Sequence, residues 1–154
     1  MLTTIISGVV IGIVVAIVSS VVTVRLSMRR FYSEKWWERK AEAYTTIVEA
    51  LFHIHLHIDE SIDEGVRGQA ISPDRDRTLA MKASEARDHL RRAAALGTFI
   101  ISPAATDAVS KCLKNLVQAD SANNYGEYLD AQGDAVSACL SEIRRLAKED
   151  LNIS

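Results

Sequence analysis

The residue types best suited to chemistry in this chain are its histidines and the glutamates spaced around them. Glu49, His53 and His57 follow one another at four-residue intervals, and Glu85 and His89 repeat that interval further along. On a helix this spacing places side chains on one face. Two imidazoles and a carboxylate presented together can bind a metal ion, and helical bundles build metal sites from facing helices. A metal-dependent hydrolase or nuclease is therefore one candidate function.

The helical positions of these residues weigh against a metal site within one chain. His53 and His57 lie opposite the apolar stripe that contains Leu51 and Ile58, so we expect them to point to solvent. The Glu-x-x-His spacing of di-iron bundles is absent. Sequence motifs for a phosphate-binding loop, a nucleophilic serine or a redox cysteine pair are absent too. We therefore expect no catalytic residue and no cofactor, and keep a metal site, in one chain or across a subunit interface, as an alternative.

The beginning of the chain predicts a membrane anchor. Residues 2–24 contain no charge and no proline and are rich in valine and isoleucine. As a helix they would extend roughly 34 Å, enough to cross a hydrocarbon core of about 30 Å. A cleaved signal peptide would have a basic start, a shorter apolar run and a small-residue cleavage site, and none of these is present. The sequence predicts a retained transmembrane helix over residues 1–25.

The charges that follow this segment predict its orientation. Residues 25–40 contain six lysines and arginines against two glutamates. Positive charge near a span stays on the cytoplasmic side and is attracted to anionic headgroups. We therefore expect a single-pass protein of the inner (cytoplasmic) membrane, with a basic juxtamembrane stalk over residues 26–40 and a cytosolic C-terminal domain. The expected membrane-interface residues are Arg25, Arg29, Arg30, Trp36 and Trp37.

Small residues within the segment suggest self-association. Gly8, Gly12, Ala16 and Ser20 recur every four residues and would form one stripe along a helix. Around Gly8 and Gly12 the pattern resembles the glycophorin-type dimerisation motif. Small side chains allow two helices in a bilayer to approach closely, which is a usual route to association. A homo-oligomer follows if the stripe is used; the alternative is an apolar span in which the glycines have no role.

The remaining residues, 41–154, predict one acidic helical domain. An acidic body argues against a nucleic-acid partner, which would need a clustered basic surface. Ser72-Pro73 and Ser102-Pro103 each place proline where helices begin. Apolar residues at intervals of three and four predict helices over residues 27–64, 73–96, 103–119 and 125–151, with Gly97 as the C-cap of the second. The residues leave open whether the first is continuous with the span and whether residues 98–101 are extended.

Together these elements predict an all-α chain: an N-terminal transmembrane helix followed by an up-down antiparallel bundle of about four helices over residues 41–154. Trp37, Tyr44, Leu51 and neighbouring apolar residues of the first helix fall near one face. The two cysteines, at positions 112 and 139, fall on apolar faces and are expected to be buried thiols.

Aromatic residues gather in one block after the span, FYSEKWWERKAEAY, residues 31–44. Trp36 and Trp37 are typical of a membrane interface, but they also lie near the face that carries Ile47, so packing in the core or between subunits is an alternative. The block resembles segments that follow the anchor in uncharacterised bacterial single-span proteins. The layout is also similar to that of membrane accessory proteins of bacterial antiviral systems, some of which form pores, and this resemblance implies an oligomeric membrane effector.

The leading hypothesis is a non-enzymatic, membrane-anchored helical protein that self-assembles through its span and bundle. It would act as an oligomeric membrane effector, pore or scaffold, and bacterial defence is the setting that the resemblance implies. The metal-dependent enzyme above is one alternative. The other is an inner-membrane anchor that recruits a soluble protein partner.

Overall fold

The computed structural model describes the backbone of residues 2–67 and 72–153. It also describes the side chains of these residues, except those of residues 2–24, 26, 29, 30, 66 and 67. The elements are α1 (Leu2–Arg67), α2 (Pro73–Leu96), the 3₁₀ turn η1 (Gly97–Phe99), α3 (Pro103–Ala119) and α4 (Tyr125–Leu151). Within these ranges every regular element is helical, which confirms the all-α prediction and the expected bounds of the last three helices.

Side-chain caps explain why these three helices begin where the sequence predicts. Ser72 Oγ accepts a hydrogen bond from the Arg75 N–H, and Ser102 Oγ accepts one from the Ala105 N–H, at 3.4 and 3.3 Å. Asn124 Oδ1 does the same for the Glu127 N–H, at 2.9 Å. Each cap satisfies a backbone donor that the first turn of a helix leaves unpaired.

The first helix is longer than the sequence predicts at its C-terminal end. Gly65 does not end α1, which continues to Arg67, and the expected second terminator, Gly68, lies outside the described residues. A glycine inside a helix costs only about 1 kcal/mol relative to alanine, so a long helix tolerates one. At its other end α1 begins at Leu2, which answers the question of continuity: the apolar segment and residues 27–64 belong to one helix.

Across the described residues, no helix has both the length and the apolar character that crossing a membrane requires. The side chains of the expected span, and with them the stripe of Gly8, Gly12, Ala16 and Ser20, lie outside the described residues. The span and the stripe therefore stay predictions.

The chain divides into two compact units, Met1–Glu38 and Arg39–Ser154. In the first unit, the described side chains near its end are exposed: Phe31, Tyr32, Trp36 and Trp37 have exposed fractions of 54, 64, 50 and 49%. Both tryptophans are thus about half exposed, and their assignment to the membrane interface or to packing in the core or between subunits stays a prediction.

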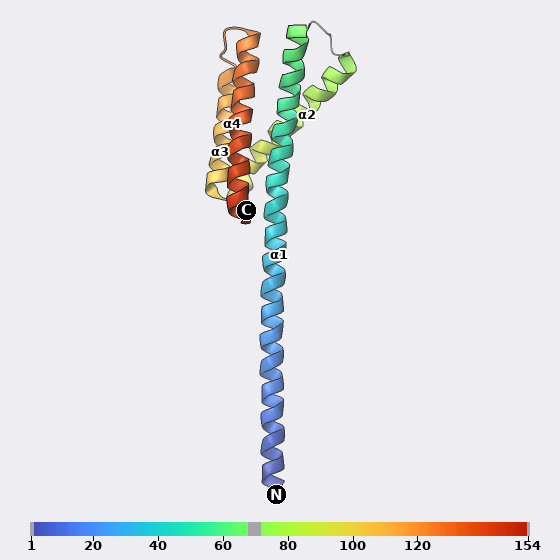
Figure 1. Cartoon of the computed structure of the whole chain (residues 1–154), viewed down its shortest axis with the longest axis vertical. Coiled ribbons are helices and arrows are strands. Elements are labelled where there is room, and N and C mark those ends of the chain that lie inside the picture. Colours follow the sequence, from blue (N-terminus) through green and yellow to red (C-terminus); the bar gives the residue numbers. More distant parts are fainter. Residues whose placement is uncertain (1, 68–71, 154) are drawn as a thin grey trace. The chain divides into compact units, whose positions relative to one another are not determined.

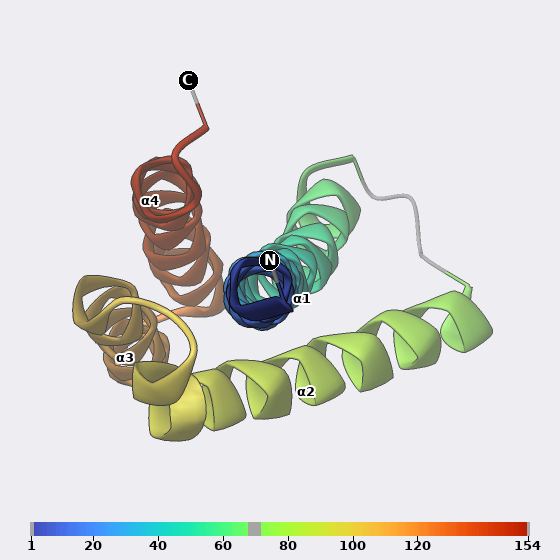
Figure 2. The same ribbon diagram turned by 90° about the horizontal axis from the view of Figure 1, so that it is seen from below.

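In the second unit the four helices alternate in direction. Figure 1 shows α3 and α4 antiparallel and side by side, whereas α2 crosses the unit obliquely. Figure 2 shows the teal and green part of α1 between α4 and α2, with α3 beside α4. The packing is therefore bundle-like, with one strongly tilted member. The largest fully buried side chains are Ile47, Leu51, Ile54 and Ile58 from α1, Leu90 from α2, Val109 from α3, and Val136 and Ile143 from α4.

The turn between α2 and α3 answers one open question and confirms one expectation. Residues 97–99 form η1 rather than an extended segment. Gly97 does end α2, but with φ −60° and ψ −32° it is right-handed, so its backbone does not require glycine. A Cβ there would lie 3.0 Å from Ile101 Cδ1 and 3.1 Å from Thr106 Oγ1. An alanine at this position would therefore require the Ile101 or Thr106 side chain to shift by a few tenths of an ångström.

A half-buried polar cluster joins α1 to the start of α3 and the end of α4. The Tyr44 hydroxyl and the Ser102 N–H, the latter at 3.1 Å, both donate to Asp150 Oδ2. Lys40 Nζ lies 4.0 Å from the same oxygen. Burial opposes ionisation of Asp150, but these hydrogen bonds outweigh it and lower the pKa of the carboxyl group. Burial and the neighbouring carboxylate raise the pKa of Tyr44 to about 12.

Candidate functional site: the groove between α1 and α2

Two adjoining pockets lie between α1 and α2 in the second unit and share Thr46 and His89. We call them together the α1–α2 groove. The first pocket, of about 310 Å³, is largely apolar, and the second, of about 240 Å³, is largely polar. Because one residue from each helix lines both pockets, a ligand in one pocket would border the other.

Helical spacing places the lining residues on two facing surfaces. On α1 they recur at intervals of three and four from Arg39 to His53, and on α2 from Lys82 to Leu96. Several of them are alanines, and small side chains on facing helices leave room that larger ones would fill. The groove therefore results from alanines at positions 43, 50, 86 and 93.

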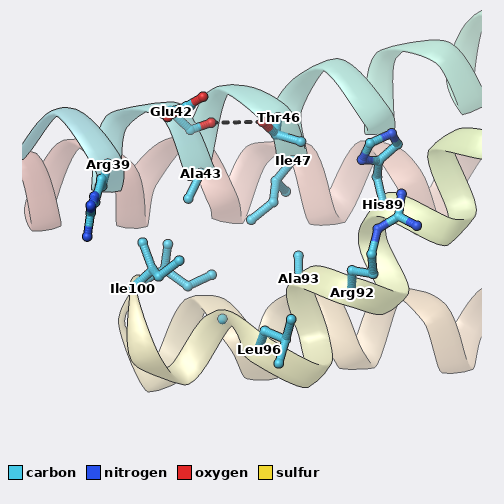
Figure 3. Close-up of a pocket in the computed structure, with 12 residues that line it drawn as sticks. Arg39, Glu42, Ala43, Thr46, Ile47, His89, Arg92, Ala93, Leu96 and Ile100 are labelled. Atoms are coloured by element: carbon cyan, nitrogen blue, oxygen red, sulfur yellow. Dashed lines mark hydrogen bonds between the residues drawn. The ribbon is translucent and has the colours of Figure 1, made fainter.

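The apolar half of the groove has a hydrocarbon floor and cationic ends. Figure 3 shows Ala43 and Ile47 of α1 pointing toward Ala93 and Leu96 of α2. Ile100 lies below Ala43 in this view. The arginines of this half lie at two separate places: Arg39 at one end, and Arg92, beside His89, at the other.

The one acidic residue in the lining of this half does not face its floor. In Figure 3 the Glu42 side chain extends to the side of α1 away from Ala93 and Leu96. The dashed line from Thr46 Oγ1 ends on the Glu42 carbonyl oxygen, 3.0 Å away. The charged groups beside the apolar floor are therefore mainly positive.

The polar half of the groove brings together four of the five residues considered for a metal site. Glu49 and His53 of α1 line it with Glu85 and His89 of α2, while His57 lies outside this lining. Lys82 also lines it and adds a positive charge. The expectation that these residues face away from the core is consistent with a surface groove, but their meeting between two helices follows only from the structure.

This arrangement does not complete a metal site. Among the described residues, no three histidine, cysteine, aspartate or glutamate side chains are close enough to bind one ion together. A structural or catalytic zinc site needs three or four such ligands. The described part of the chain therefore gives no support to the metal-dependent enzyme, and none of these residues has a catalytic role that the geometry can justify.

Sequence reasoning missed the residues that give the groove its character. Arg39 was counted with the basic collar after the span, and Arg92 was not singled out. Arg92 follows His89 by three residues, so the two share a face of α2, and this spacing is the signal that could have linked them. The opposing position of Arg39 depends on the packing of α2 against α1, which no local pattern encodes.

The two cysteines lie at a different contact, between α3 and α4. Cys112 Sγ donates to the Ala135 carbonyl at 3.7 Å, and Cys139 Sγ donates to the Ala108 carbonyl at 3.8 Å. Both are free thiols, and both are buried as predicted. The hydrogen bond with Cys112, together with burial, raises the pKa of Cys139, so this thiol stays protonated. Their role here is close packing of two helices.

No protein-family model, curated protein or solved structure matches this chain.

Proposed function

We propose that this chain is a non-enzymatic, membrane-anchored helical protein that self-assembles and acts as an oligomeric membrane effector, pore or scaffold. In this proposal the anchor is a single inner-membrane span over residues 1–25, and the up-down bundle is cytosolic. The observation that carries the proposal is the continuity of α1 from Leu2 to Arg67. One helix contains both the apolar segment and the residues that α1 contributes to the bundle core, so the expected anchor and the bundle are joined without a loop.

Exposed aromatic side chains on α1 provide the second line of support. Trp36 lies in the first unit, in the aromatic block that follows the apolar segment, whereas Ile54 belongs to the second unit. Ile54 is fully buried, whereas half of Trp36 is exposed. Exposed tryptophans are typical both of interfaces between protein subunits and of the headgroup layer of a membrane. Either surface would cover Trp36 in the assembled protein.

The test is the mass of the full-length chain in lipid nanodiscs or mild detergent, measured by mass photometry or light scattering. We expect a discrete oligomer. Replacing Gly8 and Gly12 together by isoleucine should shift it to the monomer, because branched side chains prevent close approach of the helices. The matched control replaces Val10 and Val14, on the opposite side of the helix, by isoleucine and should leave the mass unchanged.

Each result has a clear reading. A monomeric wild-type chain would contradict self-assembly. An oligomer that survives the double Gly→Ile substitution would remove the small-residue stripe from the mechanism and assign assembly to the rest of the chain. If a discrete ring-sized oligomer forms, ion conductance across a planar bilayer then separates a pore from a scaffold.

The α1–α2 groove favours a second candidate function, an anchor that recruits a partner at the membrane. A surface groove with an apolar floor and positive ends is the kind of site that takes an anionic or amphipathic ligand. Introducing a charge into its floor with Leu96→Glu should abolish recruitment without changing the oligomer mass, since Leu96 is mostly exposed and its replacement leaves the core intact. Loss of both properties together would contradict a separate recruitment site.

A further inference from the structure

The apolar half of the α1–α2 groove has the make-up of a site for a specific kind of small molecule. Its floor is formed by aliphatic side chains, among them Ile47, Leu96 and Ile100. The backbone of both walls is helical, so its N–H and C=O groups are already paired along α1 and α2. An extended peptide would therefore find few backbone partners here, whereas a hydrocarbon chain needs none.

The polar groups at the ends determine what such a chain can carry. Arg92 and His89 come together at one end of the floor, and Arg39 lies at the other. All three are exposed, so the arginine charges are solvated until a ligand arrives. Arginine presents a planar set of donors that matches a carboxylate, and the resulting hydrogen bonds are stronger than those between neutral groups. The two arginines therefore favour an anionic headgroup over a cationic one.

The size of the pocket favours a single alkyl chain. Its volume is about 310 Å³, at the lower end of the range for small-molecule pockets. A site of this size suits one alkyl chain better than a larger ligand. Burying such a chain gives about 0.8 kcal/mol per CH₂ group, so several methylene groups provide useful affinity.

From these observations we propose that the basic, apolar half of the α1–α2 groove binds a medium-chain fatty carboxylate. The alkyl chain covers the floor between Ala43, Ile47, Ala93 and Leu96, and the carboxylate binds at the end formed by Arg92 and His89. Arg39 at the opposite end adds to the positive field without contacting the headgroup. This inference does not depend on self-assembly.

Photolabelling of the full-length chain in nanodiscs tests the proposal. The probe is decanoate that carries a diazirine on its alkyl chain, and the adducts are located by peptide mass spectrometry. Adducts are expected within residues 43–47 and 93–101. Excess decanoate should suppress them. Acetate, which has the headgroup without the chain, and decyltrimethylammonium, which has the chain with the opposite charge, should not.

Three variants sharpen the experiment. Arg92→Gln should reduce the groove adducts about tenfold, in line with the loss of a hydrogen bond to a charged group. Arg39→Gln should have a smaller effect. Arg144→Gln, an exposed arginine on α4 outside the groove, is the matched control and should leave labelling unchanged.

Several outcomes would overturn the proposal. These are equal labelling of Arg92→Gln and wild type, equal competition by decyltrimethylammonium and decanoate, and adducts confined to other parts of the chain. A complete absence of groove adducts would do the same and would favour an apolar side chain of a partner protein as the occupant. The oligomer mass is read from the same nanodiscs, so a failure of this inference is distinguishable from a failure of self-assembly.

Discussion

Two stretches of α1 carry large apolar side chains in opposite surroundings. Between Tyr44 and Ile58 these side chains are covered by the other helices of the second unit, and Leu51 and Ile54 are completely buried. At Tyr32 and Trp36, in the first unit, the side chains are 64 and 50% exposed. Both stretches are helical and both carry large apolar groups, so the difference lies in what covers them and not in local structure.

The comparison separates the stabilisation that comes from burial within the chain from the stabilisation that would require a second surface. A fully buried isoleucine contributes roughly 1.5–3 kcal/mol relative to an exposed one, and this contribution is already made at Ile54. The Trp36 side chain is half exposed, so burying the rest of it against another surface would provide further stabilisation. The aromatic stretch therefore adds little to the stability of the bundle, and its benefit would come from a second copy or from lipid headgroups.

The largest expected effect follows directly from this contrast. Ile54→Ala should destabilise the bundle by about 2–5 kcal/mol, because it removes a fully buried side chain and leaves a cavity. Trp36→Ala removes more atoms but should change the stability by less than about 0.5 kcal/mol, since its side chain is half exposed outside the core. Urea unfolding of the full chain in mild detergent, followed by far-ultraviolet circular dichroism, measures both.

Substitutions at the same two positions give the reverse order in an assembly assay. Trp36→Ala should weaken either the oligomer or the attachment to anionic vesicles, whereas a folded, milder variant such as Ile54→Val should affect neither. If Trp36→Ala lowers the unfolding free energy as much as Ile54→Ala does, Trp36 is already packed and the contrast between the two stretches is wrong.

A second, smaller effect is expected at the edge of the covered stretch. Tyr44→Phe removes the hydroxyl that donates to Asp150 and should cost about 1.5–3 kcal/mol, the range for hydrogen bonds to charged groups. Tyr32→Phe is the matched control, since the Tyr32 side chain is exposed, and should cost almost nothing. Hydrogen exchange of the α4 amides near Asp150 locates the effect. Similar losses for both variants would contradict the role of the cluster.

The same cluster predicts how stability varies with pH. The pKa of Tyr44 is raised from 10.0 to about 12, so its contribution is complete below pH 10 and is lost as the pH rises toward 12. The pKa of Asp150 is lowered from 3.8, so its contribution is complete above that value and is lost as the pH falls further. Tyr44→Phe should flatten the alkaline limb of a stability–pH curve. An unchanged alkaline limb would assign it to other groups.

Local signals predicted what depends on local chemistry. The starts of α2, α3 and α4 follow from Ser72, Ser102 and Asn124, whose caps act within three residues of their own position. The stripe from Tyr44 to Ile58 also follows from periodicity alone. Periodicity also places Trp37 near this face, yet its side chain is 49% exposed. A helical face records a preference for burial but not the presence of a neighbour to provide it.

Contacts between distant residues could not be predicted in this way. Tyr44 and Asp150 meet across 106 residues of sequence, and their pairing depends on how α1, α3 and α4 pack. The groove is a similar case: Arg39 and Arg92 are ordinary surface arginines in sequence, and only the tilt of α2 places both beside one apolar floor. The individual residues were visible in the sequence, whereas the sites that they form were not.

The smallest expected effect tests whether the packing against the covered stretch of α1 can accommodate one added methyl group. A Cβ at Gly133, within α4, would lie 3.8 Å from Ile58 Cγ2, an ordinary contact distance. Gly133→Ala should therefore stabilise the bundle by about 0.5–1 kcal/mol, since alanine restricts the unfolded chain and favours a helix. Gly97→Ala, whose Cβ would lie 3.0 Å from Ile101, should give no such gain. Urea midpoints of both variants measure the difference. A loss of stability at Gly133 would mean that α4 approaches Ile58 more closely than these distances show, and that the covered face of α1 is packed to its limit.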